Sequence, residues 1–137
     1  MPGVLKIGVS GVRGIVGDSF TPGMASVFAA AFARYLGGGE ILVGHDTRRS
    51  GPSIETAVIA GLVAGGARPV RLGVVPTPTV QVAVAALGAA GGIVITASHN
   101  PPEWNGLKFI GCDGLFLDEK CASALFELYR RAPVAAV

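Results

Sequence analysis

The sequence has few charged residues and no dense basic run. Only 15% of its 137 residues are charged, and the net charge at neutral pH is +2. The longest basic runs are the pairs Arg48-Arg49 and Arg130-Arg131. Because nucleic-acid binding usually requires a denser basic patch, we expect no nucleic-acid partner.

Cysteine is also scarce. Cys112 and Cys121 are the two cysteines, and neither belongs to a CxxC motif or a Cys/His cluster. This favours reduced thiols in a cytoplasmic protein over a disulfide or a metal site. The first residues contain no long apolar segment of the kind found in secretory signals, so a cytoplasmic location is expected.

One long stretch of the sequence has no charged residues, as a membrane-spanning segment would. Residues 72–102 contain no Asp, Glu, Lys or Arg. A membrane-spanning helix needs about 20 apolar residues without interruption. Here prolines and glycines divide the stretch into shorter pieces, which favours buried strands and a buried helix, with no membrane partner.

Half of the residues are hydrophobic, and they recur in patterns that alternate between helix and strand. We predict helices that begin near Thr21-Pro22, after Gly51-Pro52, near Val80 and at Asp118. We predict strands over 41–43, 70–75, 92–96 and 107–110, and a turn over 112–114. The tail over 133–137 is expected to be loose.

Strands separated by helices predict a single α/β domain over residues 1–137, with a largely parallel sheet. In such sheets, ligands bind where loops leave the carboxyl ends of strands. The loops after Val43, Val75 and Thr96 are therefore the candidate site. The first and third of them carry the densest polar chemistry.

The segment Thr96-Ala-Ser-His-Asn-Pro-Pro102 is the most informative of these loops. Asn-Pro and Pro-Pro stiffen it, so Ser98 is held where a substrate can reach it. Lys108 lies ten residues further on and can return beside Ser98 if the chain doubles back. A lysine there would attract a phosphate as a compact positive charge.

Three roles for Ser98 are open from the residues alone. Acyl transfer would need a base and an orienting carboxylate, and the GxSxG pattern is absent. Phosphoryl transfer through a phosphoserine would need positive charge, which Lys108, Arg13 and Arg48 could supply. The third role is structural, with Ser98 shaping a turn.

Three segments resemble those of the α-D-phosphohexomutase superfamily, which includes phosphoglucomutase, phosphomannomutase and phosphoglucosamine mutase. The resemblance spans almost the whole chain and is carried by 92–108 (GIVITASHNPPEWNGLK), 10–14 (SGVRG) and 44–51 (GHDTRRSG). It implies the first of four domains, a three-layer α/β/α fold with a mixed, largely parallel sheet. The preferred sugar is left open.

The resemblance also implies a function. Ser98 would carry a phosphoryl group and move it between positions 1 and 6 of a hexose phosphate through a hexose 1,6-bisphosphate, an isomerase reaction. His99, Lys108 and Arg13 match family positions in proton transfer and charge stabilisation. Mg²⁺ would be held by the phosphate on Ser98 and by aspartates of another domain.

Each of these residues also has a structural interpretation. His99 could bond only the loop backbone, Arg13 could pair with Asp18 or Asp46, and Lys108 could be a solvated strand residue.

Other residues are expected to support the loop. These are Asn100, Arg48 and Asp46, with Arg48 steadying the loop through hydrogen bonds. Trp104 is expected to support the loop rather than to stack on a sugar. His45 is expected to be a packing residue.

The chain has no DGDxD-like aspartate cluster to complete a metal site, and no counterpart of the family's sugar-selecting and phosphate-binding loops. The missing second to fourth domains are therefore expected partners, and the isolated chain is expected to lack mutase activity. The alternative is a non-catalytic α/β module that binds a phosphosugar or a partner and retains the serine loop.

Overall fold

A computed structural model describes residues 5–8 and 11–131. The tail predicted to be loose, 133–137, lies outside the described residues. In chain order, the helices and strands are β1 (Lys6–Gly8), β2 (Gly11–Ile15), α1 (Pro22–Leu36), β3 (Gly39–His45), α2 (Gly51–Ala64), β4 (Ala67–Val74), α3 (Thr77–Leu87), β5 (Gly91–Ile95), β6 (Trp104–Ile110) and α4 (Glu119–Arg131).

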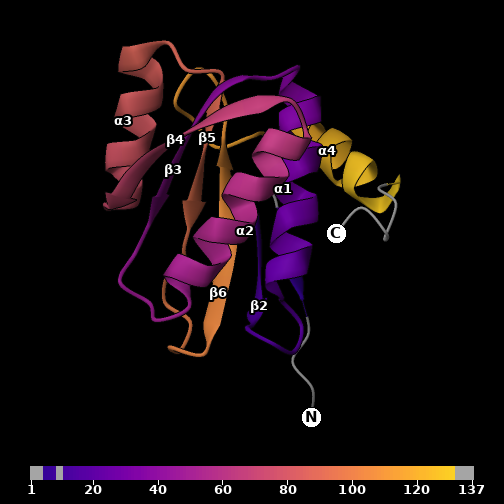
Figure 1. Cartoon of the computed structure of the whole chain (residues 1–137), viewed down its shortest axis with the longest axis vertical. Coiled ribbons are helices and arrows are strands. Elements are labelled where there is room, and N and C mark those ends of the chain that lie inside the picture. Colours follow the sequence, from indigo (N-terminus) through magenta and orange to yellow (C-terminus); the bar gives the residue numbers. More distant parts are fainter. Residues whose placement is uncertain (1–4, 9–10, 132–137) are drawn as a thin grey trace.

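The strands form one mixed sheet in the order β1-β2-β6-β5-β3-β4 (Figure 1). β3 pairs in parallel with both β4 and β5. The pairs β1/β2, β2/β6 and β5/β6 are antiparallel. The parallel part of the sheet is therefore β5-β3-β4, where helices connect the strands, and the antiparallel part runs from β1 through β2 and β6 to β5. The sheet is mixed, as predicted, but it is not largely parallel, because three of its five pairings are antiparallel.

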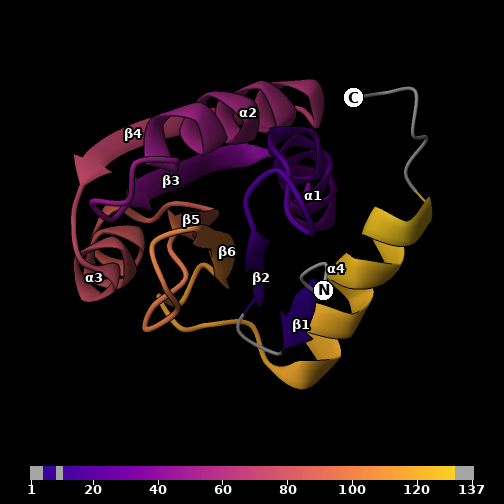
Figure 2. The ribbon, with the colours of Figure 1, turned by 90° about the horizontal axis from the view of Figure 1, so that it is seen from below.

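Helices cover both faces of the sheet, which confirms the predicted α/β/α layers. α2 and α3 lie on opposite sides of β3 (Figure 2). One face packs against α1, α2 and α4 around a core in which the Phe28 and Tyr129 rings stack at 3.6 Å between centroids. The other face packs Leu42, Val94 and Ile110 against α3.

The predicted helix boundaries follow from side-chain and glycine caps. The Thr21 hydroxyl accepts a hydrogen bond from the Met24 amide at 3.1 Å, and Gly37 ends α1 with a φ of 78°. The Asp118 carboxylate accepts from the Cys121 amide at 2.8 Å at the start of α4. Both predicted helix starts, at Thr21 and at Asp118, are confirmed.

The sequence did not predict β1 and β2. They are short and rich in glycine, so they lack the apolar alternation that marks a strand. Their pairing with each other and with β6 is what makes them strands. β6 also begins at Trp104, earlier than predicted, because its first residues pair with β2.

Close packing between α1 and α2 depends on Gly61. A Cβ atom added at Gly61 would overlap the backbone carbonyl oxygen of Ser26 and would lie 3.0 Å from the Ala29 Cβ. A backbone carbonyl within a helix has little room to move, so α2 can approach α1 only through a residue without a side chain.

Gly61→Ala is therefore expected to destabilise the fold. In an exposed helix the same substitution would stabilise by about 1 kcal/mol, because alanine is the better helix former. Here the added methyl group meets the α1 backbone, and we expect a loss of about 1–3 kcal/mol in the free energy of unfolding, measured in urea. Val63→Ala, at an exposed position of the same helix, is the control and should change stability by less than about 0.5 kcal/mol. A stabilised Gly61→Ala variant would contradict the packing argument.

Candidate active site

The loop between β5 and β6, here called the serine loop (residues 96–103), holds Ser98 in an unusual conformation. Ser98 has a φ of 54°, the only positive φ of a non-glycine residue in the described part of the chain. Its amide donates to the Thr96 hydroxyl at 3.0 Å, and the Asn100 amide donates to the Ala97 carbonyl at 3.0 Å. A serine in this left-handed region costs free energy, and such residues concentrate at functional sites.

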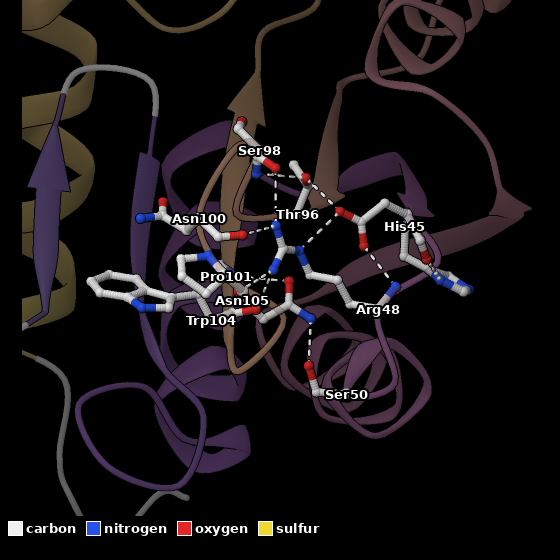
Figure 3. Close-up of polar contacts among 11 residues, drawn as sticks. His45, Arg48, Ser50, Thr96, Ser98, Asn100, Pro101, Trp104 and Asn105 are labelled. Carbon is white, nitrogen blue, oxygen red and sulfur yellow. Dashed lines mark hydrogen bonds and ion pairs between the residues drawn. The ribbon is translucent and has the colours of Figure 1, made fainter. Parts of the chain in front are cut away.

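Arg48, from the loop after β3, holds the serine loop by its backbone (Figure 3). Its side chain is only 11% exposed. One terminal nitrogen donates to the carbonyls of Pro101 and Trp104 at 2.6 and 3.0 Å. The other donates to the carbonyls of Ser98 and Asn100 at 2.9 and 2.8 Å. The fork of the guanidinium group thus fixes four carbonyl groups around one centre.

Asp46 orients this guanidinium group and also reaches the loop directly. Its carboxylate accepts from Arg48 Nε at 3.3 Å and from the Arg48 amide at 3.1 Å. It also accepts from the Thr96 hydroxyl at 2.7 Å, and that hydroxyl in turn accepts from the Ser98 amide. Asp46 pairs with Arg48 and not with Arg13, one of the two acids considered for Arg13 from the sequence.

Asn105 ties the serine loop to the start of α2, a role that the sequence did not indicate. Its side chain is fully buried, and its amide nitrogen donates to the Ser50 hydroxyl at 2.8 Å (Figure 3). Its amide oxygen accepts from the Gly106 amide at 2.9 Å. Asn105 is the second residue of β6, and its burial follows from the structure alone, so the sequence offered no signal for this role.

Ser98 lies at the edge of a hollow that also contains two of the predicted cations, Lys108 and Arg13. The hollow has a volume of about 140 Å³ and is lined by residues of β1, β2, β6 and the serine loop: Lys6, Ile7, Gly8, Gly11, Val12, Arg13, Thr96, Ala97, Ser98, Leu107 and Lys108. We call it the cationic hollow. Ser98, Lys108 and Arg13, which are far apart in the sequence, thus line one hollow.

Burial and the charge of Arg13 both lower the pKa of Lys108. Partial burial lowers the pKa of the Lys108 ammonium group below its usual value, and the positive charge of Arg13 lowers it further. The Lys108 side chain is thus partly buried in the hollow. An anion beside it would favour its charged form.

The other predicted residues lie on a second side of the serine loop. Asp46, Arg48, Asn100 and Ser98 line a second, more open hollow with Thr47, Arg49, Pro102 and Glu103. The Asn100 side-chain oxygen is buried there without a hydrogen-bond partner among the described residues. His99 is exposed and lines neither of these two hollows.

Trp104 and His45 contact neighbouring residues of the loops. The Trp104 carbonyl accepts from Arg48, and the Lys6 ammonium nitrogen lies 5.3 Å from the centre of its ring. Nδ1 of His45 donates to the Asp46 carbonyl at 2.8 Å, because a carbonyl can only accept. Its Nε2 lies 3.8 Å from the buried carboxylate of Glu55.

Cys112 and Cys121 are both free. Within residues 5–8 and 11–131, no three His, Cys, Asp or Glu side chains come together as a metal site. No helix in that same part of the chain is long and apolar enough to cross a membrane.

Comparisons with known proteins give a consistent result. Residues 4–133 match the family model described as phosphoglucomutase/phosphomannomutase, alpha/beta/alpha domain I. A probable phosphoglucosamine mutase of Methanopyrus kandleri is 50% identical over 108 residues, which cover 79% of this chain and 24% of the relative. One from Methanothermobacter thermautotrophicus is 49% identical over 109 residues, with the same coverage of 79% and 24%. The chain thus spans about a quarter of the length of these curated relatives.

Two solved structures share the fold. A putative phosphomannomutase from Thermus thermophilus superposes with a TM-score of 0.86 at 37% identity, over 98% of this chain and 31% of that one. A phosphoglucomutase/phosphomannomutase family protein from Burkholderia thailandensis gives a TM-score of 0.78 at 29% identity, over 89% of this chain and 29% of that one.

Arg48→Lys is expected to loosen the serine loop. A lysine has one nitrogen and cannot bond four carbonyls at once, so we expect a loss of about 2–4 kcal/mol in the free energy of unfolding. Hydrogen exchange at the amides of residues 97–104 should also accelerate. Arg49→Lys, at the exposed neighbouring position, is the control. Equal effects of the two substitutions on stability and on exchange would contradict the role assigned to Arg48.

Arg13→Gln is expected to raise the pKa of Lys108. The substitution leaves the burial of Lys108 in place, which is the larger cause of its lowered pKa, and removes the repulsion from Arg13. The pKa should therefore move only part of the way back to its usual value. NMR titration of the lysine side-chain signals measures this, with Arg49→Gln as the control. An unchanged or lowered pKa would show that Arg13 and Lys108 do not share one electrostatic site.

Proposed function

The chain belongs to the phosphoglucomutase/phosphomannomutase family, as its α/β/α domain I, and from this premise we propose that Ser98 carries the phosphoryl group in a hexose phosphate mutase reaction. The observation that supports this most is the placement of Ser98. Arg48 fixes it in a left-handed conformation at the edge of a hollow lined by Lys108 and Arg13.

The proposed reaction moves a phosphoryl group twice. In the first step, a hydroxyl of the hexose phosphate attacks the phosphorus on Ser98, the bond to the serine oxygen breaks, and a hexose 1,6-bisphosphate forms. The attacking hydroxyl loses a proton in the first step, and the serine oxygen gains one. In the second step, the serine oxygen attacks the phosphorus of the other phosphate of this intermediate, and the bond from that phosphorus to its sugar oxygen breaks. The serine hydroxyl loses its proton, the sugar oxygen gains one, and the isomeric hexose phosphate leaves.

The residues of this chain have separate tasks in the proposal. Arg13 and Lys108 stabilise the charge on the oxygens of the transferring group. His99 exchanges the proton with the sugar hydroxyl, because its ring is exposed and histidine is the side chain most often used as a general acid or base. Arg48 and Asp46 keep the serine loop in shape, and Asn100 faces the substrate from the second hollow.

Magnesium would neutralise charge during transfer, but the described residues do not form a site for it alone. The phosphate on Ser98 would be this chain's contribution, and carboxylates would come from elsewhere in the enzyme. We therefore propose the remaining domains of the same enzyme as partners and the cytoplasm as the compartment. Glucose, mannose and glucosamine phosphates are the proposed substrates, and the names of the relatives make glucosamine phosphate the first to test.

The experiment grafts this chain onto the remainder of the Methanopyrus kandleri relative and assays the chimera with glucosamine phosphate. We expect turnover and, by peptide mapping, phosphate on Ser98. Ser98→Ala should remove the phosphate and lower kcat at least about a thousandfold. Ser123→Ala, an exposed serine of α4, is the control and should preserve both.

In the same assay, the 137-residue chain alone should show no turnover. Phosphate on a serine other than Ser98, with full activity of Ser98→Ala, would contradict the mechanism. A chimera that binds the sugar phosphate without turnover or phosphorylation would favour a non-catalytic module.

A further inference from the structure

Lys6 of β1 also lines the cationic hollow, but the proposed reaction gives it no role. Lys6 pairs directly with Arg13 of β2, and Arg13 pairs directly with Gly106 of β6. Residues directly opposite one another in a sheet project to the same face. Lys108 lies two residues after Gly106 and so projects to that face as well. The register thus places Lys6, Arg13 and Lys108 on one face of three adjacent strands.

Gly8 leaves open space beside these three cations, because a Cβ atom added there would meet no heavy atom within 4 Å. Gly8 pairs with Gly11, which in turn pairs with Lys108, and a Cβ atom at Gly11 would overlap the Leu107 carbonyl oxygen of β6. The row that contains Lys108 therefore has no side chain on β1 or β2. The resulting hollow of about 140 Å³ is several times the share of one water molecule in the liquid, about 30 Å³. It has room for a group as small as a phosphate.

The charges in this hollow are not balanced from within. Its described lining contains three cationic side chains and no aspartate or glutamate. Like charges directly opposite each other on antiparallel strands, such as Lys6 and Arg13, destabilise the pairing. Burial lowers the pKa of Lys108, and so, to a lesser extent, does repulsion between Lys108 and Arg13. An anion bound among the three would remove this cost.

Trp104 gives the flexible Lys6 side chain a defined position. Trp104 lies two residues before Gly106, on the same face of β6, and the Lys6 ammonium nitrogen is 5.3 Å from the centre of its ring. Attraction between the cation and the ring reduces the freedom of a side chain that is otherwise exposed. Because the Trp104 carbonyl bonds to Arg48, the position of the ring is coupled to that of the serine loop.

We propose that Lys6 is a third anion contact of the cationic hollow and binds a phosphate group held beside Ser98, carried either by the serine or by the sugar. This inference deepens the proposed function and rests on it for the identity of the anion. Arg13 and Lys108 bind the same group from the other strands. Lys6 adds a charge from the edge strand β1, so it strengthens binding without forming part of the serine loop.

The first experiment titrates the 137-residue chain with inorganic phosphate and follows it by NMR. The indole N–H of Trp104 reports from beneath Lys6, since the chain has a single tryptophan, and the Ser98 amide reports from the loop. Lys6→Met should weaken phosphate binding about fivefold, as expected for loss of one exposed charged contact, and Lys6→Arg should preserve it. Lys120→Met is the matched control, because Lys120 is the one lysine outside the hollow.

The second experiment places phosphoserine at position 98 by codon reassignment and titrates its phosphate by phosphorus NMR. A nearby cation lowers the pKa of a phosphate, so Lys6→Met should raise the phosphoserine pKa if Lys6 contacts it, and Lys120→Met should not. An effect in the first experiment alone assigns the contact to the free phosphate. An effect in the second alone assigns it to the phosphoserine.

Absence of phosphate binding by the unmodified chain in the first experiment, together with an unchanged phosphoserine pKa in Lys6→Met, would overturn the inference. So would equal behaviour of Lys6→Met and Lys120→Met in both experiments. Neither experiment requires turnover. Failure of phosphate to map to Ser98 in the chimera would therefore refute the proposed function while leaving this anion contact intact.

Discussion

The site depends on one buried guanidinium group and the four carbonyls that it holds. Arg48 bonds the backbone of the serine loop at Ser98, Asn100 and Pro101, and that of the first residue of β6, Trp104. The left-handed conformation of Ser98 costs about 1–3 kcal/mol, and these charge-assisted bonds offset that cost. Both hollows have Ser98 in their walls, so the shape of each depends on Arg48.

The topology of the sheet explains why Arg48 can reach the loop. β3 and β5 are parallel neighbours, so their carboxyl ends, and the loops that follow them, emerge side by side. The Asp46 amide donates to the Ile95 carbonyl at 3.2 Å, and the Asp46 carboxylate accepts from Thr96. Two loops separated by about fifty residues thus become one rigid unit, with Asn105 and Ser50 closing it on the side of α2.

The sequence was sufficient where local signals decide the structure, and insufficient where pairing across the sheet decides it. Caps at Thr21 and Asp118 predicted the helix starts. The serine loop places Ser98, half-buried, in the lining of the same hollow as Lys108, because β5 and β6 form an antiparallel pair. Lys6 could not be found this way, because its position opposite Arg13 depends on two glycine-rich strands without an apolar pattern.

The cationic hollow has positive charge that an anion would offset. Three cations face one hollow without an aspartate or glutamate in its described lining, and no metal-binding cluster occurs in the described residues. A phosphoserine carries a charge of about −1.5 to −2 at neutral pH, which would offset most of the charge of the three cations. On the proposed function, the phosphorylated form is therefore the electrostatically balanced one. On the same proposal, a magnesium ion would add positive charge beside this hollow, and carboxylates from outside the described residues would bind the ion and offset that charge.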